Sequence, residues 1–114
     1  MFVFDTLTAV TADSSVNTAL NLVVTSVAGQ SHYLYGFGMS TSGISTSSSI
    51  NIIIKDGATS IYKTSLDPGS PVGATQFRSF PVPIKITSEN ALTLTIDAGG
   101  ASVVTIGNLV YATR

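Results

Sequence analysis

The side chains that could carry acid–base or nucleophilic chemistry are few in this 114-residue sequence, and they are scattered along it. There is one histidine, His32, and there is no cysteine. A nucleophilic triad needs a base held beside a serine, and a zinc site usually needs several His or Cys ligands. A lone histidine directly before Tyr33 is therefore expected to be structural, and neither a catalytic residue nor a metal ligand is predicted.

The carboxylates form no pair or cluster in the sequence. A glycosidase needs two carboxylates facing one cleft, and a calcium site needs several acids at close spacing. Four of the six acids stand beside glycine, proline or asparagine at turns, or in serine-rich sequence, where a carboxylate accepts hydrogen bonds from nearby backbone N–H groups. We therefore expect no enzyme and no cofactor. The acids are Asp5, Asp13, Asp56, Asp67, Glu89 and Asp97.

An alternating aromatic run begins after the histidine. Period-two alternation places Tyr33, Tyr35, Phe37 and Met39 on one face of a strand, with Leu34, Gly36 and Gly38 on the other. Such a row can be core, a subunit interface or a platform for sugars, and the sequence leaves these three open. A phosphate loop needs a third glycine and a following helix, and the run with Gly36 and Gly38 has neither. These two glycines therefore indicate a bulge or close packing. The interface candidates are Phe2, Phe4, Tyr33, Tyr35 and Phe37.

The composition narrows the class of protein. Charged residues make up 10% of the chain, against about 25% in a typical soluble protein. Sixteen serines and fifteen threonines supply much of the polar surface instead. A net charge of −1 argues against a nucleic-acid partner, which needs clustered Lys and Arg. The N-terminus does not resemble a secretory signal, and no apolar run approaches the roughly 18 residues of a membrane helix. We expect synthesis in a cytoplasm and no membrane insertion.

The elements that must position these residues are strands. Leu92-Thr93-Leu94-Thr95-Ile96 alternates apolar and hydroxyl side chains, as a half-buried strand should. Asp56-Gly57 predicts a hairpin turn, and Asp97-Ala98-Gly99-Gly100 a second one. Pro81 and Pro83 make 76–87 one edge strand with a break. The expected strands are 2–10, 20–28, 32–39, 49–55, 59–65, 76–80, 82–87, 91–97 and 102–112.

This pattern predicts an all-β fold with about eight strands and no helix. Short strands with turns every 8–12 residues are typical of an antiparallel β-sandwich or barrel, and this number suits a jelly roll. Residues 1–114 are expected to form a single β-sandwich domain. Ile52, Ile53 and Ile54 would place apolar side chains on both faces of one strand, which favours a homo-oligomer.

The order of these signals resembles a known family. Gly29-Gln30-Ser31-His32-Tyr33-Leu34-Tyr35-Gly36 enters a strand and a Ser/Thr loop follows. Ile52-Ile53-Ile54-Lys55-Asp56-Gly57, Phe80-Pro81-Val82-Pro83-Ile84, Asn90-Ala91-Leu92-Thr93-Leu94 and Ile106-Gly107-Asn108-Leu109-Val110-Tyr111 come next. In this patterning the chain is similar to the small jelly-roll decoration, or cement, proteins of tailed bacteriophage capsids.

The resemblance implies a structural virion protein without catalytic residues. Its expected partner is the major capsid protein, and its expected location is the outer capsid surface, at contacts between capsid subunits. A homotrimer is implied by the resemblance rather than by any residue. The alternative is a carbohydrate-binding β-sandwich module of a phage fibre or adhesin, which an exposed aromatic row would favour.

Overall fold

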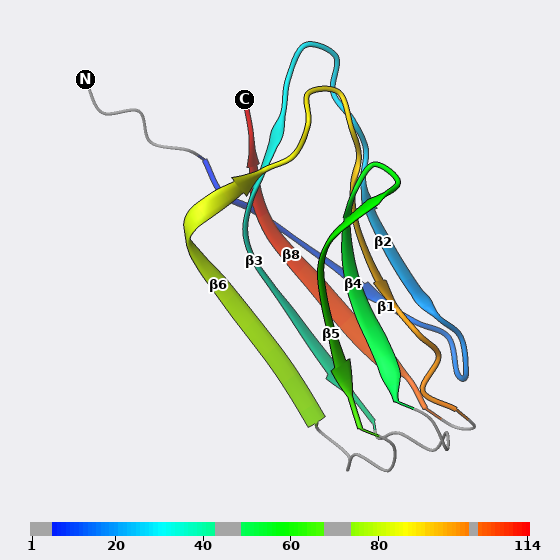
Figure 1. Ribbon diagram of the computed structural model, residues 1–114. Coiled ribbons are helices and arrows are strands. Elements are labelled where there is room, and N and C mark those ends of the chain that lie inside the picture. Colours follow the sequence, from blue (N-terminus) through cyan, green and yellow to red (C-terminus); the bar gives the residue numbers. More distant parts are fainter. Residues whose placement is uncertain (1–5, 43–48, 68–73, 101–102) are drawn as a thin grey trace.

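The computed structural model describes residues 6–42, 49–67, 74–100 and 103–114, which fold as two packed antiparallel sheets (Figure 1). Sheet A has the strand order β1-β8-β3-β6, and sheet B has the order β2-β7-β4-β5. The described residues contain no helix. The strands are β1 (Thr8–Asp13), β2 (Leu20–Val24), β3 (His32–Thr41), β4 (Ile50–Asp56), β5 (Thr59–Leu66), β6 (Ala74–Lys85), β7 (Leu92–Ile96) and β8 (Thr105–Thr113).

The strand pairing is nested, which defines a jelly roll. β1 pairs with β8, β2 with β7, β3 with β6, and β4 with β5, all antiparallel. The chain therefore folds as one long hairpin whose paired arms alternate between the two sheets. The pair β3–β8 joins the two strand pairs of sheet A, and β4–β7 joins those of sheet B. The predicted eight-stranded antiparallel β-sandwich of jelly-roll type is confirmed.

The core lies between the sheets and follows the period-two pattern. In β7, Leu92, Leu94 and Ile96 are buried, while Thr93 and Thr95 on the opposite face are half-buried. Each such aliphatic side chain contributes about 1.5–3 kcal/mol when it leaves water, so this alternation sets which face of β7 turns inward. The core side chains are Leu20, Val24, Leu34, Phe37, Met39, Ile50, Ile52, Ile54, Ile86, Leu92, Leu94, Ile96 and Leu109.

Two predicted connections have different outcomes. The β4–β5 hairpin is confirmed: Gly57, the first of its two connecting residues, has a φ of 59°, in the region that favours glycine. The hairpin at 97–100 is wrong. β7 pairs only within sheet B and β8 only within sheet A, so residues 97–104 carry the chain from one sheet to the other.

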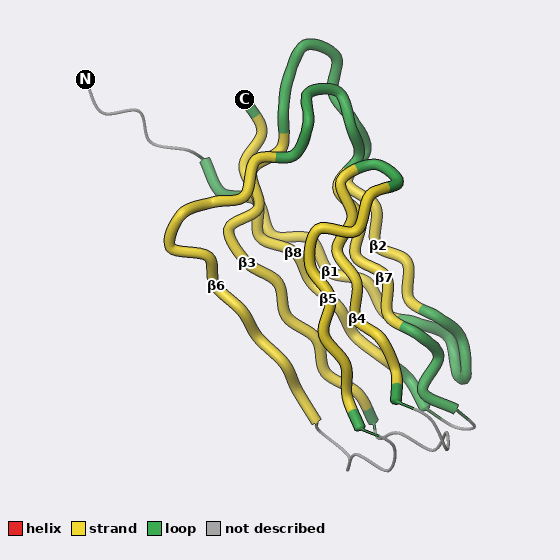
Figure 2. The backbone as a smooth tube through the Cα atoms, in the orientation of Figure 1, coloured by secondary structure: helices red, strands yellow, loops and turns green. Residues whose placement is uncertain are grey.

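Two strands differ from their expected bounds by four or more residues at one end, and a third was expected as a merged strand. The first runs from Thr8 to Asp13 rather than over 2–10, of which 2–5 lie outside the described residues. The second ends at Val24, four residues before its expected end. The merged edge strand is confirmed: β6 forms one edge of sheet A and bends along its length (Figure 2), and both prolines lie between Ser79 and Ile84, where its register with β3 is interrupted.

Candidate functional site

A β-bulge at Tyr35 reverses the side-chain alternation of β3. Leu34 is opposite Tyr111 of β8, and the next paired residue, Gly36, is opposite Val110. Tyr35 therefore has no counterpart on β8. One extra residue in a strand moves every following side chain to the other face, because the side-chain period is two.

The bulge divides the aromatic run between the two faces of sheet A. The prediction that Tyr33, Tyr35, Phe37 and Met39 share a face is wrong, because Phe37 and Met39 are buried in the core together with Leu34. Tyr33 and Tyr35 are half-buried and precede the reversal. No proline marks the position of the extra residue in the sequence. Gly36 is the one local signal, because glycine is often found at bulges.

The aromatic candidates in β3 have distinct environments. The Phe37 side chain is 4% exposed, and its ring centroid lies 5.3 Å from that of Tyr62 across the sandwich. Tyr33 is half-buried beneath the guanidinium of Arg114, whose central carbon lies 4.3 Å from the ring centroid. Phe37 is thus part of the core, while Tyr33 makes a cation–π contact at the end of the sheet.

Tyr35 contributes to a hollow of about 420 Å³ on the outer face of sheet A. The remaining interface candidates, Phe2 and Phe4, lie outside the described residues. The wall of the hollow is mostly apolar, and it draws on the residue before β1 and on three of the four strands of sheet A. Its lining residues are Leu7, Tyr35, Gly36, Phe37, Phe77, Arg78, Ser79, Phe80, Asn108 and Val110.

Two glycines of β3 lie in or beside the wall of this hollow. A Cβ on Gly36 would lie 2.8 Å from the backbone oxygen of Arg78, so β3 and β6 approach there more closely than any side chain permits. At Gly38 the missing side chain is replaced by the ring of Phe77, which occupies the space that a Cβ would enter. Phe77 itself is 70% exposed. The predicted close packing at these glycines is therefore present.

The outer face of sheet A carries almost no charge over its central rows. We call this area the outer patch, and its residues follow from the strand register and the side-chain alternation. Asp13 is its one charged member, and Ile106 is 40% exposed within it. The rows are Ala9–Val110–Gly36–Ser79, Thr11–Asn108–Gly38–Phe77 and Asp13–Ile106–Ser40–Thr75.

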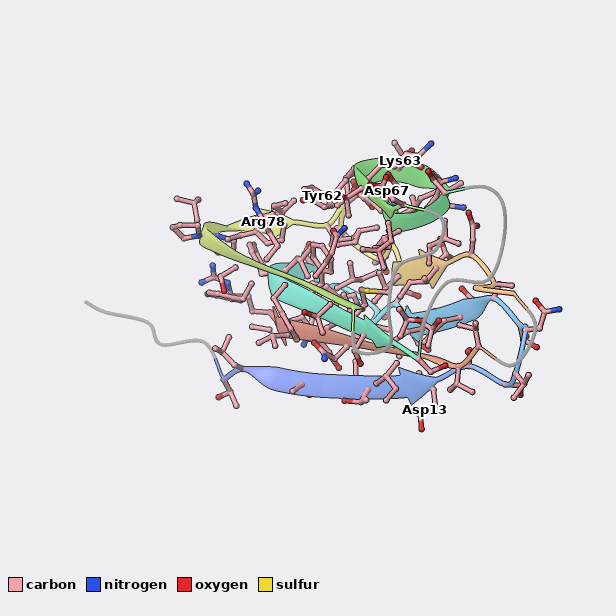
Figure 3. The ribbon with its side chains drawn as sticks, turned by 90° about the horizontal axis from the view of Figure 1, so that it is seen from below. Asp13, Tyr62, Lys63, Asp67 and Arg78 are labelled. Carbon is pink, nitrogen blue, oxygen red and sulfur yellow. The ribbon has the colours of Figure 1, made fainter. Side chains whose placement is uncertain are left out.

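The outer face of sheet B has a different character. Lys55 and Lys63 stand among threonines, serines and asparagines of the neighbouring strands, with Ile53 half-buried between them. Figure 3 shows Lys63 and Asp13 on opposite sides of the sandwich. Two lysines make this face costlier to remove from water than the outer patch of sheet A, which has one charged residue, so the outer patch is the stronger candidate for contact with a partner.

An aromatic cluster closes the sandwich where its edge strands β5 and β6 meet. The Tyr62 ring packs edge-on against Phe80 at 5.9 Å, and the guanidinium carbon of Arg78 lies 5.8 Å from both ring centroids. Figure 3 shows Arg78 and Tyr62 on this side. No local pattern of the sequence shows that β5 and β6 lie side by side, so this role of Arg78 is visible only in the structure.

The carboxylate of Asp56 joins two turns that are distant in sequence. It accepts hydrogen bonds from the Thr87 backbone N–H at 3.0 Å, the Thr87 hydroxyl at 2.7 Å and the Asn90 side-chain amide at 2.9 Å. Partial burial acts to raise the pKa of Asp56, but the hydrogen bonds from Asn90 and Thr87 outweigh it and place that pKa below its ordinary value. The carboxylate holds structure rather than a ligand.

His32 is buried, and both of its ring nitrogens are bonded within the chain. Nε2 lies 2.8 Å from the backbone oxygen of Thr25, which can only accept, so Nε2 carries the hydrogen. Nδ1 then accepts from the Thr113 hydroxyl at 2.7 Å. The ring also meets Tyr111 edge-on. These contacts tie the loop before β3 to the end of β8, as the expected structural role requires.

Neither a metal cluster nor a known relative points to an activity. Within the described ranges, no group of three His, Cys, Asp or Glu side chains could hold a metal ion. In the same ranges, no helix is long and apolar enough to cross a membrane. Comparison with protein-family models and with curated proteins found no match for this chain. The outer patch and its hollow are thus the features from which a function can be argued.

Proposed function

We propose that this chain is a structural virion protein, a capsid decoration or cement protein. It binds the outer surface of the shell and stabilises contacts between subunits of the major capsid protein. The observation that carries the proposal is the outer patch, with a single charge, an apolar hollow and the 70% exposed ring of Phe77. The jelly-roll order and the family resemblance of the sequence support it.

The physical argument is one of burial. Phe77 and Ile106 are exposed apolar side chains of the outer patch, all of its other residues except Asp13 are uncharged, and a sheet face of this kind is suited to a broad, shallow contact. A protein that binds only the assembled shell stabilises that state by mass action. No chemistry is needed for this role, and we propose that the chain is not an enzyme.

Purified virions provide the direct test. Quantitative mass spectrometry should find the chain in a fixed ratio to the major capsid protein, and shells stripped of it should rupture at a lower temperature. Adding the purified chain back should restore the higher rupture temperature. Absence of the chain from intact particles, or equal rupture temperatures with and without it, would contradict the proposal.

A carbohydrate-binding module is the second candidate, and one observation favours it. The hollow places two aromatic side chains, Tyr35 and Phe77, beside the polar groups of Asn108, Ser79 and Arg78. Aromatic surfaces with a few convergent polar groups are a common form of ligand site. Titration with oligosaccharides, followed by amide NMR shifts, would favour this reading if the shifts gathered at the hollow and disappeared in Phe77→Ala.

A further inference from the structure

The hollow and the N-terminal segment Met1–Asp5 are complementary, and we propose that this segment of one copy binds the hollow of a second copy. The inference rests on the proposed structural role and deepens it, because it names the partner of the hollow. The contact links an apolar segment to the outer patch of the next molecule. A second copy of this chain is therefore the occupant.

The first argument is the match in polarity and spacing. In an extended segment, Phe2 and Phe4 project from the same side about 7 Å apart, while Val3 projects from the other side. The hollow offers mostly apolar walls, including Leu7 and Val110, in a volume of about 420 Å³. Aromatic side chains are the usual anchors of protein interfaces, because each buries a large area with few torsions to fix.

The second argument is charge. Arg78 is the single charged residue that lines the hollow, and Asp5 is the single charged side chain of the segment. The Arg78 guanidinium packs over the Tyr62 and Phe80 rings beside β6, so the Asp5 carboxylate can meet it only at the β6 edge of the hollow, while the aromatic rings of the segment fill the interior. An opposite charge at this edge orients the segment and fixes its position along the hollow.

The third argument distinguishes a second copy from the chain's own segment. Leu7 already forms one wall of the hollow, so the same chain could enter only by reversing within Asp5 and Thr6. That reversal would draw the Asp5 carboxylate across an apolar wall, which costs free energy. A segment from another copy enters extended. The patch also continues past the hollow to Ile106, which a second molecule covers but five residues do not.

The contact is heterologous, since a segment on one copy meets a hollow on the next. Such contacts avoid open fibres only when they close, either as a reciprocal exchange between two copies or as a ring of more copies. We therefore expect a closed oligomer of the purified chain, and the resemblance noted in the sequence favours three copies.

Light scattering at known concentration tests the contact. The full chain should have a mass that is a multiple of 11.7 kDa, and a chain lacking residues 1–5 should have the mass of one copy. The double variant Phe2→Ser, Phe4→Ser should also be a single copy. Val3→Ser is the matched control and should keep the oligomer, because Val3 projects away from the hollow in an extended segment.

A second pair of variants tests the hollow itself. Val110→Arg introduces a charge into its wall and should give single copies, while Val23→Arg makes the same change on the outer face of sheet B and should leave the oligomer intact. Circular dichroism of both variants checks that the fold is kept. If Val23→Arg dissociates the oligomer and Val110→Arg does not, the contact is elsewhere and the proposal is wrong.

A labelled peptide with the sequence of residues 1–6 provides the direct binding measurement. Its fluorescence anisotropy should rise and saturate with the chain that lacks residues 1–5, and its affinity should fall by about tenfold or more when that chain also carries Val110→Arg. The absence of binding would overturn the proposal. A full chain that remains a single copy at every concentration would also overturn it, even if its own N-terminal segment covered its hollow.

The two proposals can fail separately. A single-copy chain that still binds capsids would contradict this inference and leave the decoration role standing. A ring-forming chain that is absent from virions would contradict the decoration role and leave the contact between copies standing.

Discussion

Replacing Asp56 with alanine removes the three hydrogen bonds that join the β4–β5 hairpin to the turn at 87–90. The bonds from Thr87 and Asn90 measure 2.7–3.0 Å. We take a net contribution of about 0.5–1 kcal/mol per bond, at the low end because the carboxylate is only half-buried and solvent screens it. The three bonds together then contribute about 2 kcal/mol, and Asp56→Ala should lower the free energy of unfolding by that amount.

Urea unfolding followed by circular dichroism measures this loss. With a slope of about 1–3 kcal/mol per molar urea for a small domain, the midpoint should fall by about 1 M. Asp13→Ala is the matched control, because it removes an exposed carboxylate of the outer patch that lies outside the network. Its midpoint should stay within about 0.3 M of the unaltered chain, as for most surface substitutions.

The dependence on pH tests whether the charge of Asp56 is the source. Its pKa is lower in the folded chain than its ordinary value, so the unfolded chain binds the proton more readily. The stabilisation is therefore complete above the ordinary pKa of Asp and is lost as the pH falls through the folded pKa. The difference between the unaltered chain and Asp56→Ala should narrow from about pH 7 to about pH 3. Equal midpoints at about pH 7 would refute the reasoning.

Three further substitutions test the packing. Gly36→Ala should cost about 1–3 kcal/mol, because its Cβ would meet the backbone oxygen of Arg78 at 2.8 Å; a denaturant midpoint equal to that of the unaltered chain would contradict this close approach. His32→Ala should cost about 2–3 kcal/mol by leaving buried partners unpaired, and thermal unfolding measures it, with an unchanged melting temperature as the contrary result. Leu94→Ala should cost about 2–5 kcal/mol through a cavity at a fully buried position, and calorimetry should show no comparable loss for Thr95→Ala on the opposite face.

The strands were predictable wherever one face is buried and the other is not. Leu92–Ile96 alternates so regularly that its position and its buried face follow from local pattern, and the structure shortens the expected strand 91–97 by one residue at each end. The β4–β5 hairpin follows from Asp56-Gly57, because glycine adopts the positive φ that the turn requires. The ends of strands were less predictable, since Leu20–Val24 stops where its neighbour β7 ends rather than where its apolar residues do.

The candidate site was predictable in part. The sequence singled out the aromatic run of β3 and the glycines within it, and the structure brings Tyr35, Gly36 and Phe37 to the hollow. It did not indicate Phe77 or Val110, because their position beside β3 depends on the pairing of strands far apart in the chain. The sequence around Phe77 does not show that its ring covers Gly38 of the neighbouring strand.

The sequence by itself determined the all-β class, the number of strands and the low charge of the surface, because these depend on composition and on a period of two that each strand carries alone. Only the tertiary structure decided which strands became neighbours. It decided the reversal at Tyr35, which is defined by the partner strand, and the passage of 97–104 between sheets. It also decided the bonds of Asp56 to residues 31 and 34 positions away. Such features arise from contacts between distant segments, and no local pattern encodes them.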